Sequence, residues 1–462
     1  MSFPAYSAYK DSGVEWLGEV PQHWPVYSLK RTVDGCVNGL WGDEPDGEND
    51  IAVIRVADFE RSFSAIGLDK LTYRSITPKE KQSRLIKSGD LLIEKSGGGE
   101  KTLVGCVVLF SHKFEAITSN FVARMRPLSE FDSQFLCYAF GNLYHGRVNY
   151  PSVKQVTGIQ NLDAESYLQE RFCFPPRAEQ TQITRFLDHE TARIDALIEE
   201  QQRLIELLKE KRQAVISHAV TKGLAPTVPM KDSGVELLGE VPAHWAVAGL
   251  KWFWSVTDCK HITAEFVDDG IHLASIREVQ SRYVVLDNAK QTTEVFYRQL
   301  IEGGRALVAG DLIFSRNATV GEVAQVASWH PPFAMGQDVC VLKKQYEWLS
   351  SDYLQAVLRS PIVMVQLDNL MIGSTFKRVN VEDIRGIIVP MPPQGEQKII
   401  AEYLIQRTEM FDSMLEEVQN TIALLQERRS ALISAAVTGK IDVRGWQPPA
   451  SAQAHELAQE AV

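Results

Sequence analysis

Residues 10–24 read KDSGVEWLGEVPQHW and residues 231–245 read KDSGVELLGEVPAHW, so that only two of fifteen positions differ. A second repeat closes each half of the chain, because residues 175–221 align without a gap on residues 392–438. The long segments between these repeats are much less alike. A chain that repeats its framework and varies what the framework carries predicts two related modules that recognise two different things.

The overall composition is that of an ordinary soluble globular protein. Among 462 residues, 45% are apolar and 23% are charged, which argues against a disordered or fibrous chain and leaves room for about two to four domains. The longest apolar runs, such as residues 103–110, fall far short of the roughly 20 residues that cross a bilayer. Residues 1–10 lack a basic region followed by an apolar stretch. We therefore expect a cytoplasmic protein with no membrane partner.

Neither the cysteines nor the net charge points to a metal cluster or to a coat on DNA. The cysteines have no close pair, so the sequence predicts reduced, mostly buried thiols rather than zinc ligands or disulfides. They are Cys36, Cys106, Cys137, Cys173, Cys259 and Cys340. The net charge of −11 argues against a protein that covers DNA through bulk positive potential.

Two segments without acidic residues lie at equivalent places in the two halves. Residues 133–162 contain no Asp or Glu but include basic and amide side chains, and residues 370–381 share this character. Each segment could face a phosphate backbone, and a pair of solvated loops is the alternative. The acidic stretch at residues 41–50 fits no DNA contact.

The closing repeat predicts a long helix in each half. Paired prolines at residues 175–176 and 392–393 end strand-like runs just ahead of a helix start. Downstream, two mostly apolar stripes recur in both copies with a period of about 3.5 residues and no intervening Pro or Gly. These stripes predict two helices packed as a coiled coil, each about 60 Å long over about 40 residues; a plain four-helix core is the alternative. The apolar residues expected to pack are Leu187, Ile194, Ile198, Ile205, Leu208, Val215, Leu404, Phe411, Leu415, Ile422, Leu425 and Leu432.

The segments between the repeats have the character of a mixed fold. They carry short runs of β-forming residues separated by Gly, Asn, Asp and Ser. Each also contains a Gly-Asp-aliphatic-aliphatic element, at residues 89–92 and 310–313, which leads into a polar loop at residues 95–99 or 315–319. The sequence therefore predicts two α/β, or α+β, modules in tandem whose exposed loops carry binding residues.

No group of residues assembles an active site. Residues 97–102 have Glu100 where a phosphate loop needs Gly before Lys-Thr. No HExxH or Gly-x-Ser-x-Gly pattern occurs. Asp90 with Glu94 hints at a metal-dependent nuclease centre, but the second copy has Ser315 in place of Glu94, so only one copy could do chemistry.

Taken in order, these phrases resemble the specificity subunit of type I restriction-modification systems. The resemblance covers nearly the whole length of the chain. Besides the opening repeat, it rests on FPPRAEQTQI at residues 174–183, GSTFKRVN at residues 373–380 and MPPQGEQKII at residues 391–400, with a helix that ends AAVTGKI. It implies two variable target recognition domains and two conserved helices that pack antiparallel, with internal pseudo-twofold symmetry.

The resemblance also implies a domain order. We expect a first recognition domain at residues 1–174, a first conserved helix at 175–224, a second recognition domain at 225–391, a second conserved helix at 392–442 and a disordered tail at 443–462. Each recognition domain is expected to read one half of a bipartite, asymmetric DNA site. The helix pair is expected to set the spacer between the half-sites.

Members of this family do not cut or methylate DNA by themselves. The resemblance implies double-stranded DNA as one partner and modification subunits, of which two are expected, that carry S-adenosylmethionine and methylate adenine. It also implies restriction subunits that use ATP and Mg²⁺ and translocate DNA. This chain is expected to hold no cofactor and no metal, and not to be an enzyme.

The residues expected to contact DNA come from the polar loops and from the acid-free segments. Arg, Lys, Asn and Gln side chains can make bidentate or phosphate contacts. The candidates are Lys95, Ser96, Lys154 and Gln155 in the first module, and Arg316, Asn317, Lys377 and Arg378 in the second.

Three functional hypotheses follow. The first is a DNA-reading adaptor without chemistry of its own, which predicts bipartite binding; the specificity subunit of another multisubunit restriction or methylation system is its near alternative. The second is a nuclease that uses Asp90 and Glu94 and cleaves DNA with a metal ion. The third is a coiled-coil scaffold that binds other proteins, which predicts no salt-sensitive association with DNA.

Overall fold

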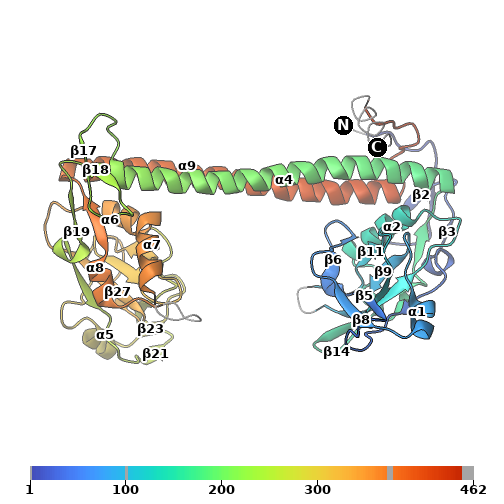
Figure 1. Ribbon diagram of the computed structural model, residues 1–462, viewed down its shortest axis with the longest axis horizontal. Coiled ribbons are helices and arrows are strands. Elements are labelled where there is room, and N and C mark those ends of the chain that lie inside the picture. The colour runs from blue at the N-terminus through green and yellow to red at the C-terminus, as the bar shows by residue number, and fades with distance from the viewer. Residues whose placement is uncertain (1–2, 99–101, 372–377, 450–462) are drawn as a thin grey trace. The chain divides into compact units, whose positions relative to one another are not determined.

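The fold of the chain mixes helices and strands and is of the α+β kind (Figure 1). The computed structural model describes every residue except 1–2, 99–101, 372–377 and 450–462. Among the residues so described, no helix is both long enough and apolar enough to cross a membrane.

The chain divides into two compact units, Met1–Glu200 with Thr421–Val462, and Gln201–Asn420. Each unit has a globular part and a portion of both long helices, α4 at Arg177–Lys222 and α9 at Gln394–Val437. The long helices therefore begin where the paired prolines of the sequence predict a helix start.

The core of the first unit is an antiparallel four-stranded sheet in the order β11, β9, β13, β4. Its inner strand β9 carries Leu91, Leu92 and Ile93, which are all fully buried. Successive side chains of a strand point to opposite faces, so both faces of this sheet are covered. The strands are β4 at Val37–Asn38, β9 at Leu91–Glu94, β11 at Val107–Leu109 and β13 at Val122–Met125.

Two three-stranded sheets complete the centre of this unit. In the first, with the order β12, β5, β8, strands β12 and β5 run parallel and place Ile117 opposite Val53. The second has the order β10, β15, β14 and is antiparallel. The strands are β5 at Asp50–Ile54, β8 at Thr72–Ser75, β10 at Ser96–Gly97, β12 at Ala116–Thr118, β14 at Val153–Thr157 and β15 at Ile159–Leu162.

Short hairpins and helices surround these sheets. The paired strands are β1 at Tyr9–Asp11 with β2 at Glu19–Pro21, β3 at Val26–Ser28 with β16 at Arg171–Cys173, and β6 at Phe59–Glu60 with β7 at Ala65–Ile66. The helices are α1 at Pro78–Arg84, α2 at Ser133–His145 and α3 at Ala164–Tyr167.

The two main sheets of the second unit repeat the strand order of the first although the sequence differs. Its four-stranded sheet, in the order β25, β24, β27, β20, corresponds strand by strand to β11, β9, β13, β4. Its other sheet, in the order β26, β22, β23, β21, again contains one parallel pair, with Ala274 of β22 opposite Met335 of β26. The strands are β20 at Trp254–Asp258, β21 at Phe266–Val267, β22 at Ile271–Ala274, β23 at Gln291–Thr292, β24 at Leu312–Ser315, β25 at Val323–Gln325, β26 at Ala334–Met335 and β27 at Val339–Lys344.

Two further strand pairs of the second unit also have counterparts in the first. Strands β17 at Met230–Asp232 and β18 at Glu240–Pro242 pair as β1 and β2 do, and β19 at Ala246–Gly249 pairs with β28 at Ile388–Met391 as β3 does with β16. The helices are α5 at Glu294–Leu300, α6 at Ser351–Leu358, α7 at Pro361–Leu370 and α8 at Val381–Gly386.

The two repeated phrases of each half meet at the start of the long helix. In the first unit Glu179 of α4 accepts a hydrogen bond from Trp24 Nε1 at 3.2 Å and lies 2.9 Å from His23 Nε2. In the second unit Glu396 of α9 makes the corresponding contacts with Trp245 and His244 at 2.9 and 2.6 Å. We call this arrangement the glutamate clamp, and it explains why a His-Trp pair and a Glu recur together in the sequence.

The next residue of each repeat makes a second set of hydrogen bonds between the long helix and its globular part. Gln180 accepts from the backbone N–H of Asp132, the N-cap of α2, and donates to the Pro175 carbonyl. Its counterpart Gln397 accepts from the N–H of Ser350, the N-cap of α6, and donates to the matching proline carbonyl. The Glu-Gln dipeptide therefore connects each long helix to its own globular part.

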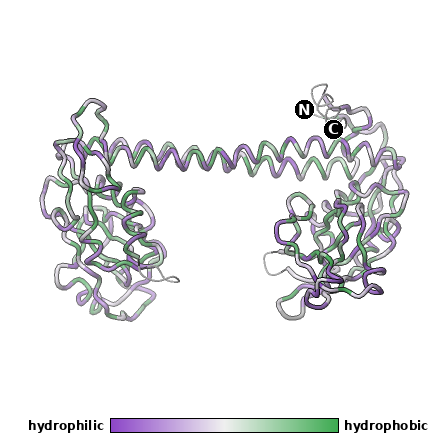
Figure 2. The backbone as a smooth tube through the Cα atoms, viewed as in Figure 1, coloured by the Kyte–Doolittle hydropathy of each residue, from purple (hydrophilic) through white to green (hydrophobic). Residues whose placement is uncertain are grey.

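Burial along the long helices follows the predicted stripes, and Figure 2 shows apolar and polar residues alternating along both. Leu187, Ile194, Leu404 and Phe411 are buried, and the other eight predicted packing residues are half-buried. Within the first unit Leu187 shares a core cluster with Ala436 and Val437 near the end of α9.

An ion pair joins α4 to α9 in each unit. Asp195 and Arg429 are 2.9 Å apart in the first unit, and Arg212 and Asp412 are 3.4 Å apart in the second. Asp412 is the repeat counterpart of Asp195, and Arg429 is the counterpart of Arg212. The repeat therefore reproduces a contact between the helices as well as their sequence.

All six cysteines are free thiols, and five are buried, as the spacing of the cysteines predicts. The first residues of the predicted tail are packed, because Val443 is buried and the Trp446 ring lies 5.4 Å from the Phe186 ring. This part of the disordered-tail prediction is therefore wrong, since these apolar side chains cover the start of α4; residues 450–462 lie outside the described part of the chain.

Candidate nucleic-acid interface

Three strands of the first unit end close together. The N–H of Ser119, after β12, donates to the carbonyl of Ile54 at the end of β5 at 2.9 Å. The N–H groups of Lys95 and Ser96, after β9, both donate to the carbonyl of Phe121, at 2.8 and 3.2 Å. The loops that follow β5, β9 and β12 are thus bonded to one another, and we call them the first strand-end cluster.

The second unit builds the same arrangement. The N–H of Gly336, after β26, donates to the carbonyl of Ala274 at the end of β22 at 2.8 Å. The N–H of Arg316, after β24, donates to the carbonyl of Asp338 at 2.9 Å. These loops form the second strand-end cluster, and both predicted polar loops belong to such clusters.

The first two candidates of the first module are partly exposed and are held by amide side chains. Lys95 Nζ donates to Asn38 Oδ1 at 2.8 Å, and Ser96 Oγ donates to Asn161 Oδ1 at 2.6 Å. Asn161 lies on β15 and is exposed. Each contact fixes a polar side chain at the surface, where it remains accessible to a ligand.

The structure brings the other two candidates, Lys154 and Gln155, to the same place. Both lie on β14, opposite Asn161 and Gln160 of β15, and β15 in turn pairs with β10. The Lys154 side chain is 72% exposed and its Nζ lies 2.7 Å from Asp163 Oδ2. The hydrogen bond from Lys154 lowers the pKa of the Asp163 carboxyl. Ser96, Lys154 and Gln155 therefore share one sheet, and Lys95 directly precedes its strand β10, although the sequence separates the two pairs of candidates by about 60 residues.

Arg316 does not lie where a DNA-reading residue would be expected. Its side chain is only 3% exposed, and one guanidinium nitrogen lies 2.6 Å from Asp258 Oδ1. Lys95, at the equivalent position, is also held by the end of the neighbouring β4, but by the neutral Asn38. The prediction that Arg316 contacts bases is therefore wrong, because Asp258 on β20 draws the guanidinium inward.

The other candidates of the second module lie on the surface around Arg316. Asn317 forms an isolated antiparallel bridge with Arg378, which is exposed. Asn317 Oδ1 accepts from the N–H of Ala318, whose φ of 56° turns the loop. The predicted loop and the acid-free segment therefore meet here as well; Lys377 lies outside the described residues.

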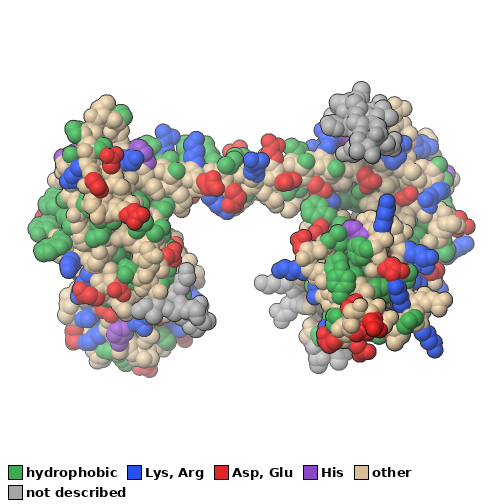
Figure 3. Space-filling view, viewed as in Figure 1, with side chains coloured by type: hydrophobic (Ala, Val, Ile, Leu, Met, Phe, Trp, Pro, Cys, Tyr) green, Lys and Arg blue, Asp and Glu red, His purple; other side chains and the backbone are tan. Residues whose placement is uncertain are grey.

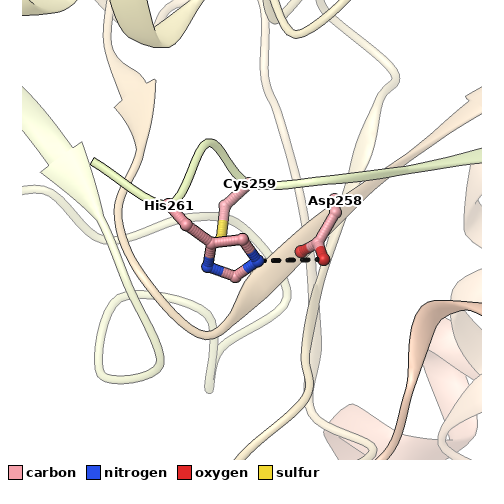
Figure 4. A group of neighbouring side chains, drawn as sticks. All are labelled: Asp258, Cys259 and His261. Carbon is pink, nitrogen blue, oxygen red and sulfur yellow. Dashed lines mark hydrogen bonds and ion pairs between the residues drawn. The ribbon is translucent and has the colours of Figure 1, made fainter.

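Asp258, Cys259 and His261 gather beside Arg316, and their possible ligand atoms lie within 4.8 Å of one another (Figure 4). His261 Nε2 is 3.3 Å from one Asp258 oxygen, and the guanidinium holds the other. A fixed positive charge at that distance opposes a metal cation at the same carboxylate. The group is therefore better suited to anchor Arg316 than to bind a metal.

The aspartates of the two Gly-Asp elements support the fold and are not placed for catalysis. Asp90 accepts two hydrogen bonds from the Arg126 guanidinium, both at 2.7 Å. Its counterpart Asp311 lies 2.8 Å from Lys343 Nζ. Each carboxylate also accepts a backbone N–H from the turn before its strand. These interactions explain why the element occurs in both halves.

Glu94, the second residue of the nuclease hypothesis, is fully buried and paired with Arg61 at 2.8 Å. Burial raises the pKa of the Glu94 carboxyl, although Arg61 opposes this effect. Asp90 directly precedes strand β9 and Glu94 is its last residue, so the two are four residues apart along an extended chain, which spans about 13 Å. Two carboxylates that far apart cannot share one metal ion, so the nuclease prediction is wrong.

A hollow of about 350 Å³ opens at the first strand-end cluster. It lies at the carboxyl ends of the parallel strands β5 and β12, a common ligand-binding position in open sheets. Its lining includes Trp41, in the acidic stretch for which the sequence indicated no role at DNA. The lining residues are Trp41, Arg55, Val56, Ala57, Ser96, Gly97, Ser119, Phe121 and Ile159.

The second unit has a larger hollow, of about 630 Å³, at the corresponding strand ends. It lies where the parallel strands β22 and β26 end, and sequence reasoning missed every residue that lines it. The polar members of the lining include Arg277, Asn288, Lys290 and Gln337. The β-type run before Arg277 was a usable signal, because a polar loop follows it as one follows each Gly-Asp element.

Comparison with known proteins agrees with the fold. The family model described as "Type I restriction modification DNA specificity domain" matches residues 299–424. A putative type I restriction enzyme MjaX specificity subunit of Methanocaldococcus jannaschii is 22% identical over 93% of this chain and 96% of its own length. The EcoKI specificity subunit of Escherichia coli K12 is 23% identical over 93% of this chain and 91% of its own length.

Over nearly its whole length the chain is therefore similar to type I restriction-modification specificity subunits. Both relatives are named as specificity subunits of type I restriction enzymes. A chain from a structure on complex assembly of the type I R-M system is similar in fold, with a TM-score of 0.69 at 14% identity over 90% of this chain and 98% of that chain. The HsdS subunit of Thermoanaerobacter tengcongensis has a TM-score of 0.52 at 15% identity, over 91% of this chain and 98% of that chain.

Proposed function

We propose that this chain is the non-catalytic specificity subunit of a type I restriction-modification system, and that each of its globular parts reads one half of a bipartite, asymmetric DNA site. The observation that carries the proposal is a shared topology with different surface chemistry: the two units have the same order in their main sheets and the same bonded strand ends, but their loops carry different residues. Equal scaffolds with unequal loops suit two unequal half-sites. The recognition domains are then residues 1–174 and 225–391.

The exposed candidates divide by chemistry. Lys154 and Arg378 suit phosphate oxygens, because an exposed cation contributes affinity without regard to sequence. Ser96, Gln155 and Asn317 suit base edges, since hydroxyl and amide groups both donate and accept. Arg316 acts as a positioning residue, whose ion pair with Asp258 holds the loop that presents Asn317.

The two long helices are proposed to act as an antiparallel coiled coil that sets the spacer. Helix α4 has 46 residues and α9 has 44, which corresponds to about 66–69 Å of helix. The buried stripes and the pair of counterpart ion pairs support antiparallel packing with a repeated register. An uninterrupted helix resists bending. Its length would therefore fix the number of base pairs that lie between the two half-sites and are not read.

The outer faces of these helices are proposed to bind two modification subunits. Apolar side chains outside the buried stripes are exposed at repeat-related positions, Leu197 with Met414 and Leu207 with Leu424. Charged residues surround them, and Figure 3 shows acidic and basic side chains mixed along the helices. Two equivalent patches suit two copies of one partner. Restriction subunits would join the same complex, and S-adenosylmethionine, ATP and Mg²⁺ would belong to these partners.

Selection from a random duplex library by the complex of this chain with its modification subunits tests the proposal. We expect two short conserved blocks separated by a constant, unselected spacer. Binding should weaken about 10³-fold or more between 50 and 200 mM salt if about six or more phosphates are contacted. Failure to enrich any sequence, together with salt-insensitive binding, would favour the protein scaffold instead. A bipartite site without a restriction partner would favour another multisubunit methylation system.

A further inference from the structure

The hollow of the second unit combines an apolar floor with a polar rim. It lies in the part of that unit labelled α5, β21 and β23 in Figure 1. Leu273, Met335 and Leu300 are buried beneath it. Arg277, just after β22, and Gln337, just after β26, are both exposed at its edge. Side chains from two neighbouring strand ends thus face one depression.

The rim side chains are not engaged by the protein. Among the described residues, no hydrogen bond or ion pair involves the side chain of Arg277, Asn288 or Gln337. Most other arginines of this globular part are held by carboxylates or backbone carbonyls. These are Arg282, Arg298, Arg305, Arg316, Arg359 and Arg385. An arginine and two amides left without partners at one rim are available for an external ligand.

A close backbone approach joins the two strand ends. A Cβ at Gly336 would lie only 2.0 Å from Ser275 Oγ, so no larger residue fits there without a shift. The resulting hydrogen bond from Gly336 N–H to the Ala274 carbonyl ties the segment carrying Gln337 to the one carrying Arg277. The spacing of the rim groups is therefore set by the rigid parallel strand pair.

The corresponding hollow of the first unit has a different character. Arg55, which follows β5 there, is bound to Asp58 through two hydrogen bonds and to the Lys70 carbonyl through a third. The large exposed side chains at its edge are instead Trp41, Phe121 and Ile159. The hollow of the second unit thus has an arginine without a polar partner among the described residues and two amides at its edge, whereas the corresponding hollow of the first unit has an apolar edge.

We propose that Arg277, Asn288 and Gln337 are specificity-determining residues that contact base edges of the second half-site. An arginine matches the paired acceptors of guanine, and Asn or Gln matches adenine, so this half-site contains at least one purine read at this rim. The rim is continuous with the loop of Asn317 and Arg378, because Asp338 follows Gln337 and bonds to Arg316. This inference rests on the proposed function and assigns the recognition to particular side chains.

Library selection with Arg277→Ala and Gln337→Ala complexes tests the proposal. Each variant should lose roughly 10- to 100-fold discrimination at one base pair of a single half-site. The other half-site and the spacer should stay unchanged, which also shows that the variant is folded. Arg298→Ala is the matched control, because its side chain is 76% exposed on α5, is paired with Glu294 alone among the described residues, and is not one of the residues that line the hollow.

The outcomes separate this inference from the proposed function. If the wild-type complex selects no bipartite site, the proposed function fails. If the wild-type complex selects a bipartite site and both variants select it with unchanged fidelity, the proposed function stands and the assignment of the rim is overturned. An unchanged site would also be the result if the hollow served a small molecule.

Discussion

Removal of the glutamate clamp is expected to destabilise the two units unequally. Glu179 accepts from Trp24 Nε1 and from Tyr6 Oη, at 3.2 and 2.5 Å, and its side chain is 7% exposed. Glu396 accepts from Trp245 Nε1, has no tyrosine contact among the described residues, and is 41% exposed. The repeat therefore supplies two versions of one contact that differ in burial and in the number of donors.

The expected costs follow from the donors left without an acceptor. A buried donor that loses its partner costs about 1–3 kcal/mol. Glu179→Ala leaves two such donors, on Trp24 and Tyr6, so we expect a loss of about 2–5 kcal/mol in the first unit. Glu396→Ala leaves one, on Trp245, beside a site that water can reach, so we expect about 1–2 kcal/mol.

Native-state hydrogen exchange of the full chain, read by mass spectrometry, measures the two effects separately. The first turns of α4 and α9 should exchange faster in their own variant and normally in the other. Glu179→Gln and Glu396→Gln are matched controls, because the amide oxygen still accepts from the indole. An equal or larger effect of Glu396→Ala, or unchanged exchange in both variants, would refute the reasoning.

Three further predictions concern the surface, the helices and the rejected active site. Lys154→Ala should reduce the slope of log affinity against log salt by about one, whereas Lys209→Ala, on the helix surface, should leave the slope unchanged; equal slopes would contradict the phosphate role. In urea unfolding, Arg429→Ala should cost about 1–3 kcal/mol and Arg212→Ala under about 1 kcal/mol, because Arg429 makes two hydrogen bonds in a pair that is less exposed than the Arg212–Asp412 pair; the reverse order would contradict this. Asp90→Asn should lower stability, and neither it nor the wild-type chain should cleave DNA with Mg²⁺ or Mn²⁺; cleavage that depends on this residue would contradict the structural role.

Local patterns in the sequence were sufficient to predict the framework. The paired prolines and the stripes predict both long helices, because helix periodicity is visible within a single window of residues. The topology of the globular parts could not be predicted from the sequence, because it depends on contacts between distant segments. Its strands have two to six residues, and the parallel pairs join segments about 60 residues apart. No local pattern reports which short strands pair.

The candidate interface was predicted in part. The Gly-Asp elements correctly located the loops after β9 and β24, and the acid-free segment located Lys154 and Gln155. Arg316 was predicted as a base reader because its residue type suits DNA, but Asp258, 58 positions earlier in the chain, binds it in the interior. An ion-pair partner so far away in the sequence cannot be recognised without the fold. For the same reason the sequence did not indicate that Arg277 and Gln337 lie at one rim.

Genome-wide adenine methylation, read by long-read sequencing, tests the central claim most directly. Cells that carry this chain with its modification subunit would be compared with the same cells lacking only this chain. We predict one bipartite, asymmetric methylated motif with a constant spacer that disappears when the chain is absent. Methylation that is unchanged in cells lacking the chain, while the modification subunit remains active, would contradict the account.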